Sequence, residues 1–298
     1  MNRPPRRSWF RAASWACLSA SLAAAGSEAS YRVPFVWTPG QIEVAVRVND
    51  APATFLLDTG AEYSVVSSRL IGLLKLGTDR SRGRDFAEDV TLQVGDVILR
   101  HQRVMVMPFD TYYARGRSID GLLGYDVFSR FVTAIDFGAR RITLWAPSAF
   151  KAPAAAISIP IEFVGRLPTV SSTLKLTGGR TLPARLMLDT GASQSVILRY
   201  PFASQNGLFD LIKDPASSAT EVPSLASGNV NLIDIPVEQV AVSPRLTFDR
   251  PRVQAFREPT GSGAFASSDG LVGNALLARY TLIVDYPHKR VLLQPRRR

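Results

Sequence analysis

The chain is nearly without cysteine and histidine, two residue types on which many enzymes depend. Its 298 residues include one cysteine, Cys17, and two histidines, His101 and His288. Cys17 lies in an N-terminal segment with the features of a cleavable leader, so we expect a mature protein with neither a disulfide nor a thiol nucleophile. Both histidines stand among polar or basic neighbours and are interpreted as surface residues, which disfavours a Ser-His-Asp triad.

Other common chemistries are also missing. No group of His, Cys and carboxylates has the spacing of metal ligands, and there is no GxxxxGK[ST] phosphate loop, so we expect no metal and no cofactor. The formal net charge of +10 falls to +3 when seven terminal arginines are set aside. These are Arg3, Arg6, Arg7, Arg11, Arg296, Arg297 and Arg298. Since no stripe of Lys and Arg alternates with aromatic residues between them, we expect no nucleic-acid partner.

Residues 1–29 have the pattern of a signal peptide. A basic start is followed by a modest apolar stretch from about Ala12 to Ala25, with small residues around a cut after Ala23, Ala25 or Ala29. The stretch is too short and too rich in Ser and Ala for a membrane span. We expect an exported protein, periplasmic or secreted, without a stable membrane span in the mature chain. A disordered basic N-terminus is the alternative interpretation.

The composition favours a β-rich globular protein. Hydrophobic residues make up 46% of the chain, and 20 Pro and 21 Gly divide many short apolar runs. Glu43–Val48 alternates with a period of two, and Thr54–Leu57 and Val104–Met107 are continuous apolar runs, so all three are predicted strands. Helices are expected to be few and short, with Tyr125–Arg130 and Asn274–Arg279 as the best candidates.

Two segments occur twice in the chain, in the same order. FLLDTGAEYSVV (Phe55–Val66) returns as LMLDTGASQSVI (Leu186–Ile197), and DGLLGYDVFSRFVTAIDFGARRITLW (Asp120–Trp145) returns as DGLVGNALLARYTLIVDYPHKRVLLQ (Asp269–Gln294). Each later segment is predicted to contain two strands around a turn, near Gly138 or Pro287. The repeats indicate a duplication, with lobes at 31–145 and 157–295 and a linker at 146–156.

The repeated acid, Asp58 and Asp189, is the remaining candidate for catalysis. Two carboxylates held close together cannot both ionise cheaply, so the pair shares one proton over an acidic-to-neutral range. The ionised acid can take a proton from water as the water attacks an amide carbonyl, and the protonated acid can polarise the carbonyl oxygen. This chemistry requires no serine, cysteine, histidine or metal.

The neighbours of the two acids suit this chemistry. Gly60 and Gly191 allow the backbone to turn sharply and bring N–H groups near the acid. Thr59 and Thr190 have hydroxyls that can bond across to the opposite loop and fix the acids relative to each other. The apolar runs before each Asp would be buried strands that form a rigid support.

The two Asp-Thr-Gly-Ala segments, each with a downstream Asp-Gly-Leu-Xaa-Gly, resemble the retropepsin-like aspartic proteases. They are most similar to bacterial exported aspartyl protease-like proteins with two such domains in one chain. The resemblance implies an all-β, bilobal architecture of two tandem pepsin/retropepsin-like β-barrel lobes. It also implies an aspartic endopeptidase whose dyad, Asp58 and Asp189, forms in cis within a monomer, and a peptide or unfolded protein as substrate.

The resemblance also implies further elements of the site. Leu122–Gly124 and Leu271–Gly273 would pack behind the active-site loops, and a β-hairpin flap would lie near Asp79–Ala87, around Gly83. The second copy is longer between its motifs, 84 positions from Asp189 to Gly273 against 66 in the first copy. We interpret the extra residues near 215–229 as an insertion, which leaves the second flap without a predicted position.

The sequence departs from the viral members of the family behind the dyad. Where those proteins have an ion pair between an acid and an arginine, this chain has Glu62 with Tyr125 and Ser193 with Asn274. The viral mode of dimerisation is therefore not expected. Three other interpretations remain: two merely structural turns, a protease-like module that binds peptides or a partner without cutting, and a dyad completed by another chain.

Overall fold

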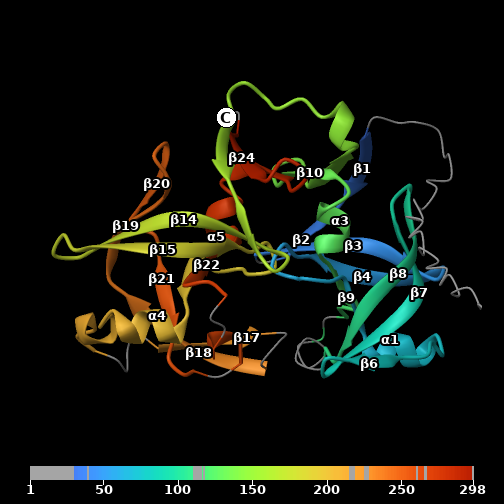
Figure 1. Ribbon diagram of the computed structural model, residues 1–298, viewed down its shortest axis with the longest axis horizontal. Helices are drawn as coiled ribbons and strands as arrows, with labels where there is room; N and C mark the ends of the chain where they lie inside the picture. Colours follow the sequence, from blue (N-terminus) through green and yellow to red (C-terminus); the bar gives the residue numbers. More distant parts are fainter. Residues whose placement is uncertain are drawn as a thin grey trace, which may run out of the picture.

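The computed structural model describes residues 30–38, 40–109, 116, 118–214, 219–224, 228–259, 261–264 and 267–296. The predicted signal peptide lies outside this part of the chain. Strands dominate and form three sheets, whereas the helices are short, which confirms the all-β prediction (Figure 1). Among the described residues, no helix has the length and apolar character needed to cross a bilayer.

The first half of the chain forms an eight-stranded sheet in the order β2-β3-β4-β9-β5-β8-β7-β6, which we call the first lobe. Its strands are β2 (Val36–Thr38), β3 (Gln41–Val48), β4 (Ala51–Leu57), β5 (Val65–Ser67), β6 (Asp79–Ser81), β7 (Arg84–Val94), β8 (Val97–Met107) and β9 (Gly121–Leu123). Two short helices, α1 (Ser68–Leu73) and α3 (Tyr125–Phe128), follow β5 and β9.

The second half forms a ten-stranded sheet, the second lobe, in the order β17-β18-β21-β16-β22-β15-β14-β19-β20, with β13 also paired to β14. Its strands are β13 (Glu162–Val164), β14 (Leu167–Leu176), β15 (Thr181–Leu188), β16 (Val196–Leu198), β17 (Ala219–Ser224), β18 (Gly228–Ile235), β19 (Val237–Ser243), β20 (Leu246–Asp249), β21 (Val253–Phe256) and β22 (Gly270–Val272). The helical segments are α4 (Tyr200–Gln205), α5 (Asn274–Leu277), η2 (Phe209–Leu211) and η3 (Gly261–Ala264).

A six-stranded sheet in the order β1-β11-β10-β23-β24-β12 joins the lobes, and it lies above and between them in Figure 1. Its strands are β1 (Ser30–Pro34), β10 (Val132–Asp136), β11 (Arg141–Trp145), β12 (Ile157–Pro160), β23 (Tyr280–Asp285) and β24 (Arg290–Pro295). At its centre β10 pairs antiparallel with β23, with Thr133 opposite Val284. The turn η1 (Pro147–Ala149) lies in the predicted linker. The lobe boundaries read from the sequence remain predictions.

Both lobes place their elements in the same order around the repeated aspartate. In the first lobe β4 runs parallel to β9, and in the second β15 runs parallel to β22. The aspartates that begin the later repeats brace these pairs: Asp120 accepts a hydrogen bond from Thr54 N (3.0 Å), and Asp269 accepts one from Arg185 N (2.7 Å). A short helix follows each of β9 and β22, near the positions predicted from the sequence.

Side-chain alternation along each aspartate-bearing strand separates two environments. In β4, Leu57 belongs to the main core, whereas Leu56 belongs to a smaller cluster on the opposite face. Alternation puts Asp58 on the same face as Leu56, and likewise Asp189 on the same face as Met187. We call these small clusters the first-lobe cluster and the second-lobe cluster. The first contains Leu56, Ala61, Val65, Phe109, Ile119 and Leu122; the second contains Met187, Ile197, Leu232, Phe256 and Leu271.

Candidate active site

Each of the two predicted acids sits just beyond the end of a buried strand. Asp58 N donates to Leu123 O (2.9 Å) and Asp189 N donates to Val272 O (3.0 Å), so the repeated apolar-Gly segments lie directly beside the two loops. At Gly124 a side chain would not fit, because a Cβ there would come within 2.5 Å of Tyr63 O. These segments therefore brace the acid-bearing loops.

The loops of the two lobes are tied to each other by their threonines. Thr59 Oγ1 donates to Leu188 O (2.7 Å) and accepts from Thr190 N (3.0 Å). Thr190 Oγ1 in turn donates to Leu57 O (2.8 Å) and accepts from Thr59 N (3.0 Å). Both threonines are buried, so these four bonds form a dry, symmetric link between segments 131 residues apart.

The two glycines allow each carboxyl to approach the opposite loop. A Cβ on Gly60 would lie 2.9 Å from Asp189 Cγ, and a Cβ on Gly191 would lie 2.6 Å from Asp58 Cγ. Each acid also accepts from its own loop: Gly60 N donates to Asp58 Oδ1 (2.7 Å), and Gly191 N donates to Asp189 Oδ1 (2.8 Å). The structure thus brings all six predicted site residues together, and the two carboxyls interact directly.

The surroundings raise the pKa of both acids, to different extents. Burial raises the pKa of Asp58 well above its ordinary value, and the neighbouring Asp189 raises it further. Burial also raises the pKa of Asp189, but the Gly191 N–H and the charge of Arg199 oppose this rise. Both residues keep partial solvent exposure, so dense protein around the carboxyls, rather than exclusion of all water, causes these shifts. A single shared proton is therefore favoured on Asp58.

Arg199 is a site residue that the sequence reasoning missed. It follows β16 at the start of α4, is 4% exposed, and interacts electrostatically with Asp189. Burial lowers the pKa of its guanidinium, and the charge of Asp189 acts in the opposite direction. The sequence did contain a signal. Arg199 stands two positions after the repeated segment that ends at Ile197, whereas the first copy has a serine at the corresponding place.

Tyr286 is a second residue near the dyad that the sequence did not predict, and its aromatic ring packs between the two lobes. Its hydroxyl donates to Thr59 O (3.4 Å), and its ring packs against Tyr125, Phe128 and Phe163. Burial, with the charges of both catalytic candidates, raises the pKa of this phenol well above its ordinary value, so it stays neutral. In the first copy the corresponding position is Phe137, which contains no hydroxyl.

Other contacts replace the ion pair that the sequence lacks behind the dyad. In the second lobe, Asn274 Nδ2 donates to Thr190 O (2.6 Å) and to Gly40 O (2.8 Å) of the first lobe. In the first lobe, the Arg166 guanidinium lies over Tyr63 (4.4 Å) and Tyr125 (5.2 Å). Arg166 comes from the second lobe, so each loop is supported by a contact that crosses between lobes.

The hairpin predicted as a flap is present in the first lobe. Strands β6 and β7 pair around Arg82 and Gly83, whose positive φ values of 50° and 75° are those of a tight two-residue hairpin turn. Arg84 Nη1 contacts Glu62 Oε2 (3.2 Å), and Phe86 stacks edge-on against Tyr63 (5.2 Å). The hairpin is thereby fastened to the loop that follows Asp58.

The segment near 215–229, interpreted as an insertion, is described only in part, and its residues 219–224 and 228–229 belong to two paired strands. Strands β17 and β18 form an antiparallel hairpin, with Ala219 opposite Ile233, and occupy the place in the second lobe that β6 and β7 have in the first. Val222 and Val230 of this hairpin pack against the second-lobe cluster. Pro236 separates β18 from β19, and Pro251 lies between β20 and β21, at places where β7 and β8 of the first lobe continue without a break.

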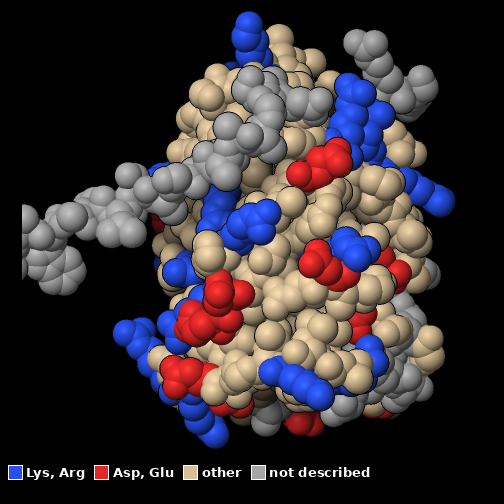
Figure 2. All heavy atoms as spheres, turned by 90° about the vertical axis from the view of Figure 1, so that its right-hand side faces the viewer, with Lys and Arg blue, Asp and Glu red and all other residues tan. Residues whose placement is uncertain are grey.

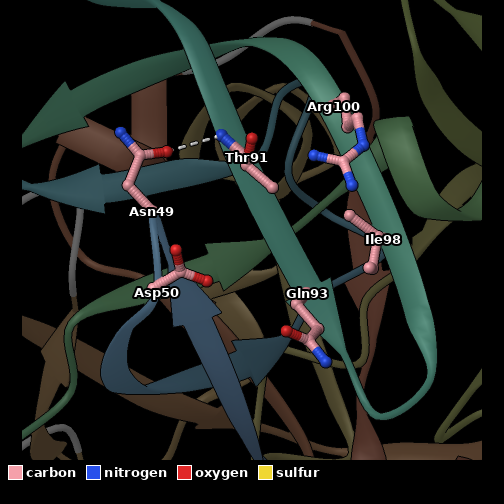
Figure 3. A pocket seen from close by; sticks show the side chains of 6 residues that line it. All are labelled: Asn49, Asp50, Thr91, Gln93, Ile98 and Arg100. Carbon is pink, nitrogen blue, oxygen red and sulfur yellow. Dashed lines mark hydrogen bonds between the residues drawn. The ribbon is translucent and has the colours of Figure 1, made fainter.

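Features elsewhere are separate from this site. A hollow of about 240 Å³ is lined by Asn49, Asp50, Thr91, Gln93, Ile98 and Arg100, at the opposite end of β4 from Asp58 (Figure 3). His101 and His288 are paired with Asp89 and Asp285, and their side chains are 82% and 49% exposed, which confirms the surface interpretation.

The described residues contain no group of three or more His, Cys, Asp or Glu placed to hold a metal ion. On the face shown in Figure 2, acidic and basic side chains are interspersed.

Comparison with known proteins bears on the resemblance and on the fold. Residues 44–127, from β3 to α3, match the family model described as aspartyl protease. Among solved structures, the aspartic proteinase from Irpex lacteus is similar, with a TM-score of 0.55 over 90% of this chain and 97% of that one, at 14% identity. At this identity the likeness concerns the fold. No match was found among curated protein sequences. The predicted resemblance to aspartic proteases is confirmed.

Proposed function

We propose that this chain, which has the fold of an aspartic protease, is an aspartic endopeptidase that uses Asp58 and Asp189 to activate water. The observation that carries the proposal is the reciprocal threonine link, which holds two Asp-Thr-Gly loops from different lobes with each carboxyl against the opposite glycine. Two merely structural turns would not require this mutual arrangement, nor two raised pKa values at one point.

In the proposed mechanism Asp58 begins protonated and Asp189 ionised. Asp189 takes a proton from water as the water oxygen bonds to the amide carbon, and Asp58 gives its proton to the carbonyl oxygen. In the second step the C–N bond breaks, the leaving nitrogen takes a proton from Asp189, and a hydroxyl of the tetrahedral intermediate returns a proton to Asp58. The dyad then regains its starting state with one carboxylic acid and one amine as products.

Substrate, oligomeric state and location belong to the same proposal. We infer a peptide or unfolded protein as substrate, because the reaction acts on amide bonds. We infer a monomer, because one chain supplies both acids and their link. Export to the periplasm or the exterior is inferred from the leader pattern in residues 1–29.

Cleavage of a peptide library at mildly acidic pH tests the proposal. Purified protein lacking residues 1–29 should cut peptides and be inhibited by a statine-type compound. Asp58→Asn and Asp189→Asn should each reduce kcat at least about 10³-fold while retaining the wild-type circular dichroism spectrum. Activity that survives either change would refute the dyad. A folded wild type that binds peptides and cuts none from pH 3 to 7 would instead indicate a catalytically silent peptide- or protein-binding module.

A further inference from the structure

The second-lobe cluster has polar neighbours at positions that are apolar or small in the first lobe. The strand register shows the correspondence. Val65 lies opposite Leu122 on one side and Met105 on the other, and Ile197 lies in the same way between Leu271 and Gln254. Gln254 thus has the place of Met105. Ser268, directly before Asp269, has the place of Ile119, which directly precedes Asp120.

Arg199 completes this set of differences. Its backbone N–H donates to Asp269 O (2.9 Å), just as Ser67 N donates to Asp120 O (2.7 Å) in the first lobe. The small neutral side chain of Ser67 in the first lobe is therefore replaced by the buried cation of Arg199 in the second lobe. At these three corresponding positions the second lobe is more polar than the first, with Gln254 for Met105, Ser268 for Ile119 and Arg199 for Ser67.

Gln254 and Arg199 lie on the face of the sheet that bears Asp189. Gln254 is two residues from Phe256, and Arg199 is two residues from Ile197, so alternation directs each pair to the same side of the sheet. Phe256 and Ile197 belong to the second-lobe cluster, on the face of Met187 and Asp189. The Arg199 guanidinium carbon is 5.7 Å from the centre of the Phe256 ring.

Two of these groups are buried without a hydrogen-bond partner. Gln254 is 3% exposed and Ser268 is 4% exposed, and within the described part of the chain neither Gln254 Nε2 nor Ser268 Oγ has a partner. Leaving a buried donor unpaired costs free energy, so native structures seldom do so without a ligand, a water or an ion. A ligand that accepts hydrogen bonds would remove this cost.

The chemistry of the three side chains defines that ligand. A guanidinium, an amide N–H and a hydroxyl all donate hydrogen bonds, and the guanidinium adds positive charge. A carboxylate supplies up to four acceptor sites and the opposite charge, and arginine matches its planar geometry. The ligand expected in the cleft of a peptidase is thus an aspartate or glutamate side chain of the substrate.

We propose that Arg199, Gln254 and Ser268 form a subsite on the second lobe that accepts an acidic side chain of the peptide substrate. The proposal rests on the proposed peptidase function and adds its specificity. The apolar first-lobe cluster then accepts an apolar side chain on the other side of the scissile bond. The β17–β18 hairpin packs on the second-lobe cluster through Val222 and Val230, and the proposal requires it to move aside when the acidic side chain enters.

Matched peptides that differ only by Glu or Gln test the charge directly, because the two side chains have nearly the same shape. Wild type should cut the Glu peptide with a kcat/KM roughly ten- to a hundredfold higher, in keeping with a charge-assisted hydrogen bond. Arg199→Met should bring the ratio close to one. Arg245→Met is the matched control, since Arg245 is an exposed second-lobe arginine in the turn between β19 and β20, at the opposite edge of the sheet from the β17–β18 hairpin, and its ratio should equal that of wild type.

A second variant protects the test against a folding defect in Arg199→Met. The double change Gln254→Met and Ser268→Ile installs the first-lobe residues Met105 and Ile119 at the corresponding places, and it adds apolar side chains to an apolar cluster. This variant should lose the preference for Glu and gain activity toward Leu or Met at the same peptide position. Its folding is checked by thermal unfolding alongside wild type.

The outcomes separate this proposal from the proposed function. If wild type cuts peptides without preferring Glu, or if the preference survives in both variants, the subsite is wrong and the peptidase stands. Peptide affinities measured with Asp58→Asn give a readout without turnover. If no protein cuts peptides but Glu peptides bind at least tenfold more tightly than Gln peptides, and Arg199→Met removes the difference, the subsite stands and the peptidase is wrong. Equal affinities without cleavage would overturn both.

Discussion

Replacing Thr59 by valine should uncouple the two lobes at the dyad. Valine has nearly the shape of threonine but lacks the hydroxyl that donates to Leu188 O (2.7 Å) and accepts from Thr190 N (3.0 Å). Thr59 is 3% exposed, so water cannot readily replace either partner. Each buried group left unpaired costs about 1–3 kcal/mol, which gives a loss of about 2–6 kcal/mol in the free energy of unfolding. That is a large part of the 5–15 kcal/mol typical of a folded protein.

Urea unfolding measured by tryptophan fluorescence, together with peptide cleavage, examines this expectation. Thr59→Ser is the control, because serine retains the hydroxyl and should lose about 1 kcal/mol or less. The valine variant should also lose most of its kcat, since the acids are positioned through the same link, and small errors in placement are costly in catalysis. A Thr59→Val protein with both the stability and the kcat of wild type would refute the view that these hydroxyls hold the two loops together.

Two further predictions follow from the same site. The raised pKa of Asp58 means that the folded protein keeps a proton that the unfolded chain loses above about pH 3.8, so stability falls as the pH rises from there towards the folded pKa. Asp58→Asn removes this penalty and should raise the melting temperature at pH 7 but not at pH 3; calorimetry showing equal changes at both would contradict it. Gly124→Ala places a Cβ 2.5 Å from Tyr63 O and should destabilise by about 2 kcal/mol or more in urea. Gly83→Ala, strained by its φ of +75° but in open space, should cost only about 1 kcal/mol, and equal losses would refute the steric argument.

The catalytic candidates were predictable because their signal is local and repeated. Asp58 and Asp189 each stand in a contiguous segment, and a second copy of the segment shows that the first is not an accident of composition. The strands on either side were also predictable, since alternation or a continuous apolar run marks burial directly. Thus β3 and β4 begin two or three residues before the predicted runs, β10 and β11 lie on either side of the predicted turn near Gly138, and β8 begins seven residues before the predicted run Val104–Met107.

The helices that follow β5 and β16 were missed for a different reason. Each is six residues long, too short for a helical repeat of apolar residues to stand out. Helix α1 depends instead on its cap, in which Ser67 Oγ accepts from Leu70 N (3.2 Å), and on packing of Leu70 and Ile71 into the core. The β17–β18 hairpin was missed because its Ser-, Gly- and Pro-containing sequence has the composition of a loop.

The sequence by itself determined the class of fold, the duplicated loops and the two acids, because each depends on neighbours within a dozen residues. Only the tertiary structure decided what surrounds them. Asn274 meets Gly40 across 234 positions, and Tyr286 meets Thr59 across 227, so no local pattern could reveal either contact. The difference between the acids has the same origin. Arg199 is ten residues from Asp189 in the chain, yet only the folding of β16 beside β22 buries its charge within reach of that carboxyl, whereas the corresponding place in the first lobe is occupied by Ser67.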